Sequence, residues 1–124
     1  MPRPAHYWQE CIKLMNKAIA TLEKVPLEDA GYLAAQTLLA SYESELGKMR
    51  IRHREEESSQ TAYESAQQAI ANLPKSIDRY NRDRTTKEIL MIINKLERVK
   101  PQTTVYSEAR STINFANKKL EQLS

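Results

Sequence analysis

The chain has 124 residues, of which 40% are hydrophobic, and its 19 lysines and arginines exceed its 16 acidic residues to give a formal net charge of +3. This length fits one domain, and two glycines and five prolines are too few for the many tight turns of an all-β fold. The longest apolar run, residues 89 to 93, is far shorter than the roughly 20 residues that span a bilayer. We therefore expect no membrane contact. The single cysteine, Cys11, cannot form an internal disulfide, which favours a cytoplasmic location.

Apolar residues recur every three or four positions in the first half of the chain, which predicts two helices that pack side by side. The first helix is expected over residues 5 to 24 and ends before Pro26, which has no amide hydrogen to donate. The second helix resumes at Tyr32 and keeps the same spacing as far as Met49. The two stripes consist of Trp8, Ile12, Met15, Ile19 and Leu22, and of Tyr32, Ala35, Leu39, Tyr42, Leu46 and Met49.

The stretch from residue 50 to residue 61 leaves two alternatives open. Its stripe positions are polar, yet no glycine or proline interrupts it. Thr61 and Glu64 have the spacing of a capping box, in which two side chains bond to the backbone amides at a helix start, so a new helix could begin at Ala62. The alternative is one helix over about residues 29 to 72.

The second half of the chain predicts a connector and two more helices. Residues 74 to 84 are polar and charged, so we expect a connector there with at most a short helical turn. Thr85 and Glu88 have capping-box spacing and open a helix that closes at Pro101. The last helix follows from about Thr104. The predicted fold class is therefore all-α: two similar antiparallel helical hairpins joined by a long or broken central helix, in a helical bundle.

The two predicted hairpins match each other when the sequence is shifted by 74 residues. Residues 12 to 48 then align with residues 86 to 122 without a gap, and eight of these 37 positions are identical. This match predicts an internal duplication. We expect a single helical domain over residues 1–124, with repeat one at 5–49, a central helix and connector at 50–84, and repeat two at 85–123. The identical pairs include Ile19 with Ile93, Leu22 with Leu96, Val25 with Val99, Tyr32 with Tyr106 and Ala35 with Ala109.

The first hairpin has aromatic, alanine and leucine residues at recurring positions around a Val-Pro turn. These residues are Tyr7, Cys11 or Ile12, Ala18, Ile19, Leu22, Pro26, Tyr32, Ala35, Leu39 and Tyr42. The pattern resembles the second helix of a tetratricopeptide repeat followed by the first helix of the next one. It is also similar to degenerate helical-hairpin repeats that are common in cyanobacterial proteins. The resemblance implies a TPR-like scaffold or adaptor and implies no chemistry.

Two basic stretches and one aromatic pair are candidate partner-binding sites. The simplest interpretation of the basic stretches is a solvated helix with intrahelical ion pairs, and the functional one is an electrostatic docking surface for nucleic acid or an acidic partner. Tyr7 and Trp8 lie near the start of the chain, where exposed rings would mark a contact with another subunit. The basic residues are Lys48, Arg50, Arg52 and Arg54 in the first stretch, and Arg79, Arg82 and Arg84 in the second.

Nothing in the sequence has the pattern of a catalytic or metal site. His6 and His53 lack metal-ligand spacing, and Gly31 and Gly47 are too isolated to form a phosphate-binding loop. We expect no enzyme activity, no cofactor and no small-molecule substrate. The leading expectation is a non-catalytic protein-protein interaction or scaffold module that binds another protein or itself, for example as a dimer. The alternative is a small basic helical subunit that binds the nucleic acid backbone.

Overall fold

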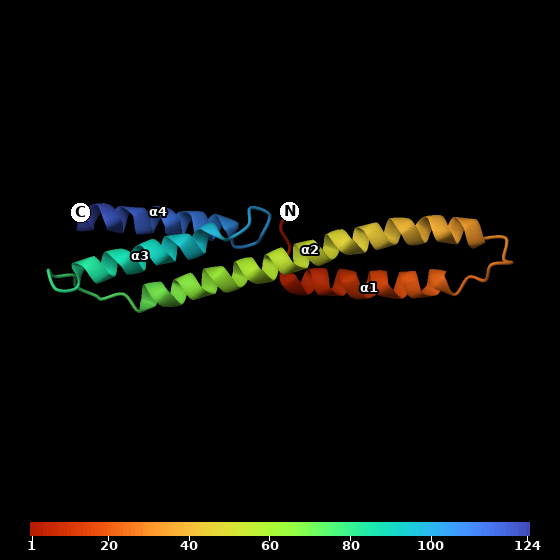
Figure 1. Ribbon diagram of the computed structural model, residues 1–124, viewed down its shortest axis with the longest axis horizontal. Coiled ribbons are helices and arrows are strands. Elements are labelled where there is room, and N and C mark those ends of the chain that lie inside the picture. Colours follow the sequence, from red (N-terminus) through yellow and green to blue (C-terminus); the bar gives the residue numbers. More distant parts are fainter. The chain divides into compact units, whose positions relative to one another are not determined.

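The computed structural model describes all 124 residues and consists of four helices with no strand (Figure 1). The helices are α1 (Ala5–Glu23), α2 (Tyr32–Ala71), α3 (Arg82–Glu97) and α4 (Tyr106–Leu123). The predicted all-α fold class is confirmed. None of the four helices combines the length and the apolar character that crossing a bilayer would require.

The long helix α2 is continuous through residues 50 to 61, so the second of the two alternatives for this stretch is correct. Thr61 lies inside the helix, and Glu64 accepts a hydrogen bond from the Gln60 side chain at 3.0 Å. The capping box suggested by Thr61 and Glu64 therefore does not mark a helix start. Glutamate, arginine and glutamine, which have high helix propensity, keep this polar stretch helical.

The helix α3 begins at Arg82, before the capping box that we expected at Thr85. That expectation was wrong because an earlier turn supplies the helix start. The Asp78 carboxylate accepts hydrogen bonds from two backbone amides that follow it, at 2.8 and 3.1 Å, and the Asn81 side chain accepts one from the Asp78 amide at 2.9 Å. Thr85 is buried in the first turns of α3, and Glu88 faces Arg84.

The chain packs as two compact units, which are described separately. The N-terminal unit comprises Arg3–Glu55 and the C-terminal unit contains Glu56–Ser124, so that α2 contributes its first half to one unit and its second half to the other. In the N-terminal unit, α1 and the first half of α2 form an antiparallel hairpin (Figure 1). Its core is small and consists of Ile19, Leu39 and Leu46, with Ile12, Met15, Leu22 and Tyr42 packed against them.

The C-terminal unit contains three helical segments, because the second half of α2 packs against the hairpin of α3 and α4. Its core is larger than that of the N-terminal unit, and several of its side chains are almost completely buried. The core residues exposed by 2% or less are Ala66, Ile89, Ile92, Leu96 and Ala109.

The loop between α3 and α4 is tied to α2 by side chains of α2. The Ser59 hydroxyl accepts a hydrogen bond from the Lys100 amide at 2.9 Å. The buried Glu56 carboxylate accepts one from the Thr104 amide at 3.0 Å and another from the Thr104 hydroxyl. These bonds fix the position of the loop in the C-terminal unit.

The two hairpin loops have the same backbone hydrogen bonds, displaced by 74 residues. The Asp29 amide donates to the Pro26 carbonyl at 3.0 Å, and the Thr103 amide donates to the Lys100 carbonyl at 3.2 Å. Four further backbone bonds beside each loop correspond in the same way. Their amide donors are Lys24, Val25, Tyr32 and Ala35 in the first hairpin and Arg98, Val99, Tyr106 and Ala109 in the second. No residue in the chain has a positive φ angle, so both loops are built without left-handed backbone.

Candidate interaction surfaces

One edge of α3 is covered by the second half of α2 in the C-terminal unit. Along this edge Thr85, Ile92, Leu96 and Val99 are exposed by only 1%, 2%, 1% and 4%. The contact continues along the helix, since Lys95 reaches α2 with a hydrogen bond. A third helical segment therefore fills the groove beside this hairpin.

The corresponding edge of α1 has no such cover within the N-terminal unit, which contains only two helical segments. The residues 74 positions before the four buried ones are Cys11, Ala18, Leu22 and Val25, and all four are only half-buried. Leu14 falls on the same edge by helical spacing and is 62% exposed. The N-terminal hairpin thus has an open groove where the C-terminal hairpin has a filled one.

The loop end of this groove is a pocket with a volume of about 470 Å³. Leu22 and Val25 line it from the side of α1, and Leu38 lines it from α2 and is 43% exposed. We call the surface formed by Cys11, Leu14, Ala18, Leu22, Val25 and Leu38 the open groove. All six side chains are uncharged, and the pocket at the loop end is lined in addition by two charged residues of opposite sign, Lys24 and Asp29.

The aromatic pair suggested by the sequence lies at the start of α1. The rings of Tyr7 and Trp8 meet edge to face, with their centroids 5.1 Å apart. Tyr7 is 38% exposed, whereas Trp8 is half-buried and has the Arg52 guanidinium 5.9 Å from its ring centroid. Tyr7 lies one helical turn before Cys11, so its ring is at the far end of the edge that carries the open groove.

The first basic stretch lies on α2 in the N-terminal unit. Its four cations follow each other in steps of two residues, and each step rotates by about 200° around a helix, so they do not share one face. Lys48 is paired with Glu45 at 3.3 Å. Arg50, Arg52 and Arg54 are exposed. These residues form a solvated surface around the helix and no compact site.

The second basic stretch lies in the C-terminal unit, at the start of α3. Arg79 donates a hydrogen bond to the Tyr80 hydroxyl at 2.9 Å and lies over the same ring. Arg84 faces Glu88 at 3.7 Å, and Arg82 is exposed. The two basic stretches therefore belong to different units, and each has at least one cation engaged within its own element.

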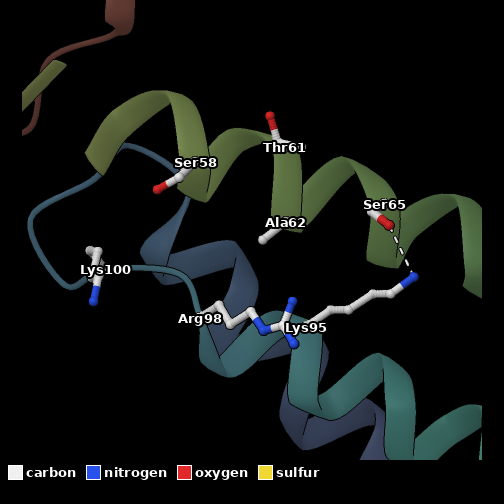
Figure 2. A pocket seen from close by; sticks show the side chains of 7 residues that line it. All are labelled: Ser58, Thr61, Ala62, Ser65, Lys95, Arg98 and Lys100. Carbon is white, nitrogen blue, oxygen red and sulfur yellow. Dashed lines mark hydrogen bonds between the residues drawn. The ribbon is translucent and has the colours of Figure 1, made fainter. Parts of the chain in front are cut away.

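Sequence reasoning missed a basic pocket between α2 and the end of α3, which has a volume of about 460 Å³ (Figure 2). Three cations and two serines line it, and the Lys95 ammonium donates a hydrogen bond to the Ser65 hydroxyl at 3.0 Å. The lining contains no carboxylate. We call it the basic pocket. Its residues are Ser58, Thr61, Ala62, Ser65, Lys95, Arg98 and Lys100.

The sequence contains a signal for the basic pocket, although it does not identify the site. Lys95, Arg98 and Lys100 fall within six residues, and Ser58 and Ser65 are two helical turns apart. That these two sets face each other depends on how α2 packs on α3, which the sequence pattern does not specify.

No group of three or more histidine, cysteine, aspartate or glutamate side chains gathers where it could hold a metal ion. Comparisons with known protein families, with curated proteins and with solved structures found no match for this chain. The features of the chain that bear on function are the open groove, the basic pocket and the residues around them.

Proposed function

We propose that the chain is a non-catalytic protein-protein interaction module that associates with a second copy of itself through the open groove. The observation that carries this proposal is the difference in burial between equivalent positions of the two hairpins. Thr85 and Ile92 are covered by a helix, whereas Cys11 and Ala18 are half-buried and Leu14 is exposed. The same hairpin geometry buries this edge when a helix is supplied to it.

A second copy is the occupant that fits the chemistry of the open groove. A two-fold contact places the same surface on both sides, so each residue meets a different residue of the other copy except near the axis, where like residues face each other. The six residues that define the open groove are uncharged and include both small and large side chains, and the two charged residues of its loop-end pocket, Lys24 and Asp29, have opposite signs and can pair across such a contact. Two hairpins in contact through this surface form a four-helix arrangement in which large side chains pack over small ones.

The energetics of the N-terminal unit also favour association. A hairpin of two helices has one buried seam, and helical repeats usually need a third unit before they bury enough surface to be stable. Leu14 and Leu38 are 62% and 43% exposed, so covering them in each copy contributes about 1–2 kcal/mol per side chain. The resemblance to tetratricopeptide-like repeats points to the same class of function, and a cytoplasmic location would keep the Cys11 thiol reduced.

The test is the molar mass of the purified chain by light scattering over a range of concentrations. We expect a dimer that is insensitive to salt, because the contact is apolar. The double variant Leu14→Glu/Leu38→Glu should be a monomer, since association would bury unpaired carboxylates.

The matched control is Leu90→Glu, which changes a leucine of α3 that is 47% exposed and lies outside the open groove. It should remain a dimer. A wild-type chain that stays monomeric at every concentration would contradict self-association, and so would a Leu90→Glu variant that dissociates as fully as the double variant.

A further inference from the structure

We propose that the basic pocket binds a small anion that carries phosphate groups, held by Lys95 and Arg98, with Lys100 at the edge of the pocket. This site lies within the C-terminal unit and does not depend on the proposed self-association through the open groove. Figure 2 shows the arrangement: Lys95 reaches across to Ser65, Arg98 extends along α3 toward Lys95, and Lys100 stands on the loop beyond the end of the helix.

The local charge of the basic pocket is strongly positive. Three full positive charges line it, and no carboxylate does. The dipole of α3 places the equivalent of about half a negative charge at its C-terminus. This is enough to favour one cation there, but it leaves most of the positive charge of the three cations uncompensated. Glu64, next in sequence to Ser65, is engaged by Gln60 at 3.0 Å. Glu57 and Glu97 are also next in sequence to lining residues but do not line the pocket themselves, so the side chains that an anion would meet there are positive or uncharged.

The pocket is held in place before any ligand enters. The Lys100 backbone is bonded to Ser59, and the loop is bonded a second time through Thr104 and Glu56. The half-buried Lys95 is oriented by its hydrogen bond to Ser65. Lys95 is therefore already positioned and loses little conformational entropy on binding, whereas the exposed side chains of Arg98 and Lys100 become ordered when the ligand binds.

The chemistry of the lining suits phosphate. Arg98 has a planar guanidinium that bonds to two phosphate oxygens at once, and the two lysines are compact charges that suit the remaining oxygens. On the α2 side, Ser65 is the hydroxyl within bonding distance of a cation, while the Thr61 hydroxyl points away from α3 (Figure 2). A volume of about 460 Å³ has room for two linked phosphate groups.

Only three cations line the basic pocket, and they lie around the end of α3, which favours a small anion over a nucleic acid strand. Binding an extended strand requires a row of cations that follows its backbone. In the C-terminal unit, Arg79 lies on Tyr80 and Arg84 faces Glu88, so neither extends the basic pocket into such a row.

The test is titration of the full chain with pyrophosphate. Calorimetry measures the binding, and the backbone amide signals in nuclear magnetic resonance spectra show which residues it affects. We expect saturable binding of one pyrophosphate per chain, with signal changes at residues 95 to 100 and at Ser65. The variants Arg98→Gln and Lys95→Gln should each weaken binding by at least about tenfold, and Arg98→Lys should weaken it less than Arg98→Gln.

The matched controls are Lys87→Gln and Lys118→Gln, which remove one charge each from exposed positions of the same unit outside the pocket. They should leave the affinity within about twofold. The proposal is overturned if wild-type chain shows no saturable binding, if the controls weaken binding as much as Arg98→Gln, or if a single-stranded oligonucleotide binds tightly while pyrophosphate does not compete with it. Circular dichroism of each variant establishes that the helices are intact.

Discussion

Glu56 is a buried charged residue that holds the loop between α3 and α4 against α2. Its carboxylate is 3% exposed and accepts hydrogen bonds from both the amide and the hydroxyl of Thr104. Burial of a carboxylate is unfavourable unless its oxygens are bonded, and here the loop between α3 and α4 supplies the donors. From the sequence Glu56 could only be described as a polar residue at a stripe position, because its donors are 48 residues away.

Replacing Glu56 by alanine should therefore lower the stability of the C-terminal unit. We expect the variant Glu56→Ala to lose about 1–3 kcal/mol of unfolding free energy, since the Thr104 amide and hydroxyl lose their acceptor. Urea unfolding measures this loss, and hydrogen exchange should show faster exchange of the Thr104 amide.

The matched control for this change is Glu64→Ala, which removes an exposed glutamate of the same helix. Its only contact is with Gln60, so the change should be about 0.5 kcal/mol or less. Equal losses in the two variants would show that the Glu56 contacts contribute nothing beyond an exposed pair.

At the scale of helices, the sequence predicts most boundaries because stripes and prolines are local signals. The ends of α1 and α3 follow from Pro26 and Pro101, which lie just beyond them. The start of α3 could not be predicted with the same accuracy. Several residues between 76 and 86 have side chains that can cap a helix, and only the folded turn shows that Asp78 and Asn81 bond to each other.

Thr61 distinguishes a continuous α2 from two shorter helices. At a helix start, Thr61→Ala would remove a cap and cost about 1 kcal/mol. Because Thr61 is an exposed residue inside α2, we expect Thr61→Ala to stabilise the chain by a few tenths of a kcal/mol, about the difference in helix propensity.

The companion variant Thr61→Gly should destabilise the chain by about 0.5 kcal/mol, since glycine is the less favourable residue in a helix interior. Thermal unfolding of the three chains in parallel gives both differences. A loss of stability in Thr61→Ala comparable to removal of a cap would contradict a helix that is continuous at this position.

At the scale of the whole chain, two hairpins with the same loop bonds differ in what lies beside them. The segment of α2 that covers α3 precedes the second hairpin, and no equivalent segment is packed on α1 within the N-terminal unit. The repeat could be predicted from aligned residues such as Leu22 and Leu96. The asymmetry between the hairpins could not, since it depends on which helix α2 packs against.

This asymmetry predicts different local stabilities for the two units. At a concentration low enough to keep the chain monomeric, the amides of α1 should exchange at least about tenfold faster than those of α3. The reason is that Cys11 and Ala18 are half-buried where Thr85 and Ile92 are fully buried. Hydrogen exchange followed by mass spectrometry measures both helices in one sample.

Raising the protein concentration should slow exchange in α1 and leave α3 unchanged, because dimerisation covers only the open groove. Equal protection of α1 and α3 at every concentration would mean that the extra helix beside α3 adds no stability. The Leu14→Glu/Leu38→Glu variant should show no dependence on concentration.

The backbone of the two hairpin loops also bears on how such a chain can evolve. Since no residue has a positive φ angle, no position is reserved for glycine. Gly31 and Val105 occupy equivalent places, and a side chain added at Gly47 would meet open space. Backbone handedness therefore does not restrict which residues the two loops can carry, although a Cβ at Gly31 would lie 3.2 Å from the Asp29 carboxylate, so that side-chain contacts and not backbone handedness decide whether a substitution in these loops is tolerated.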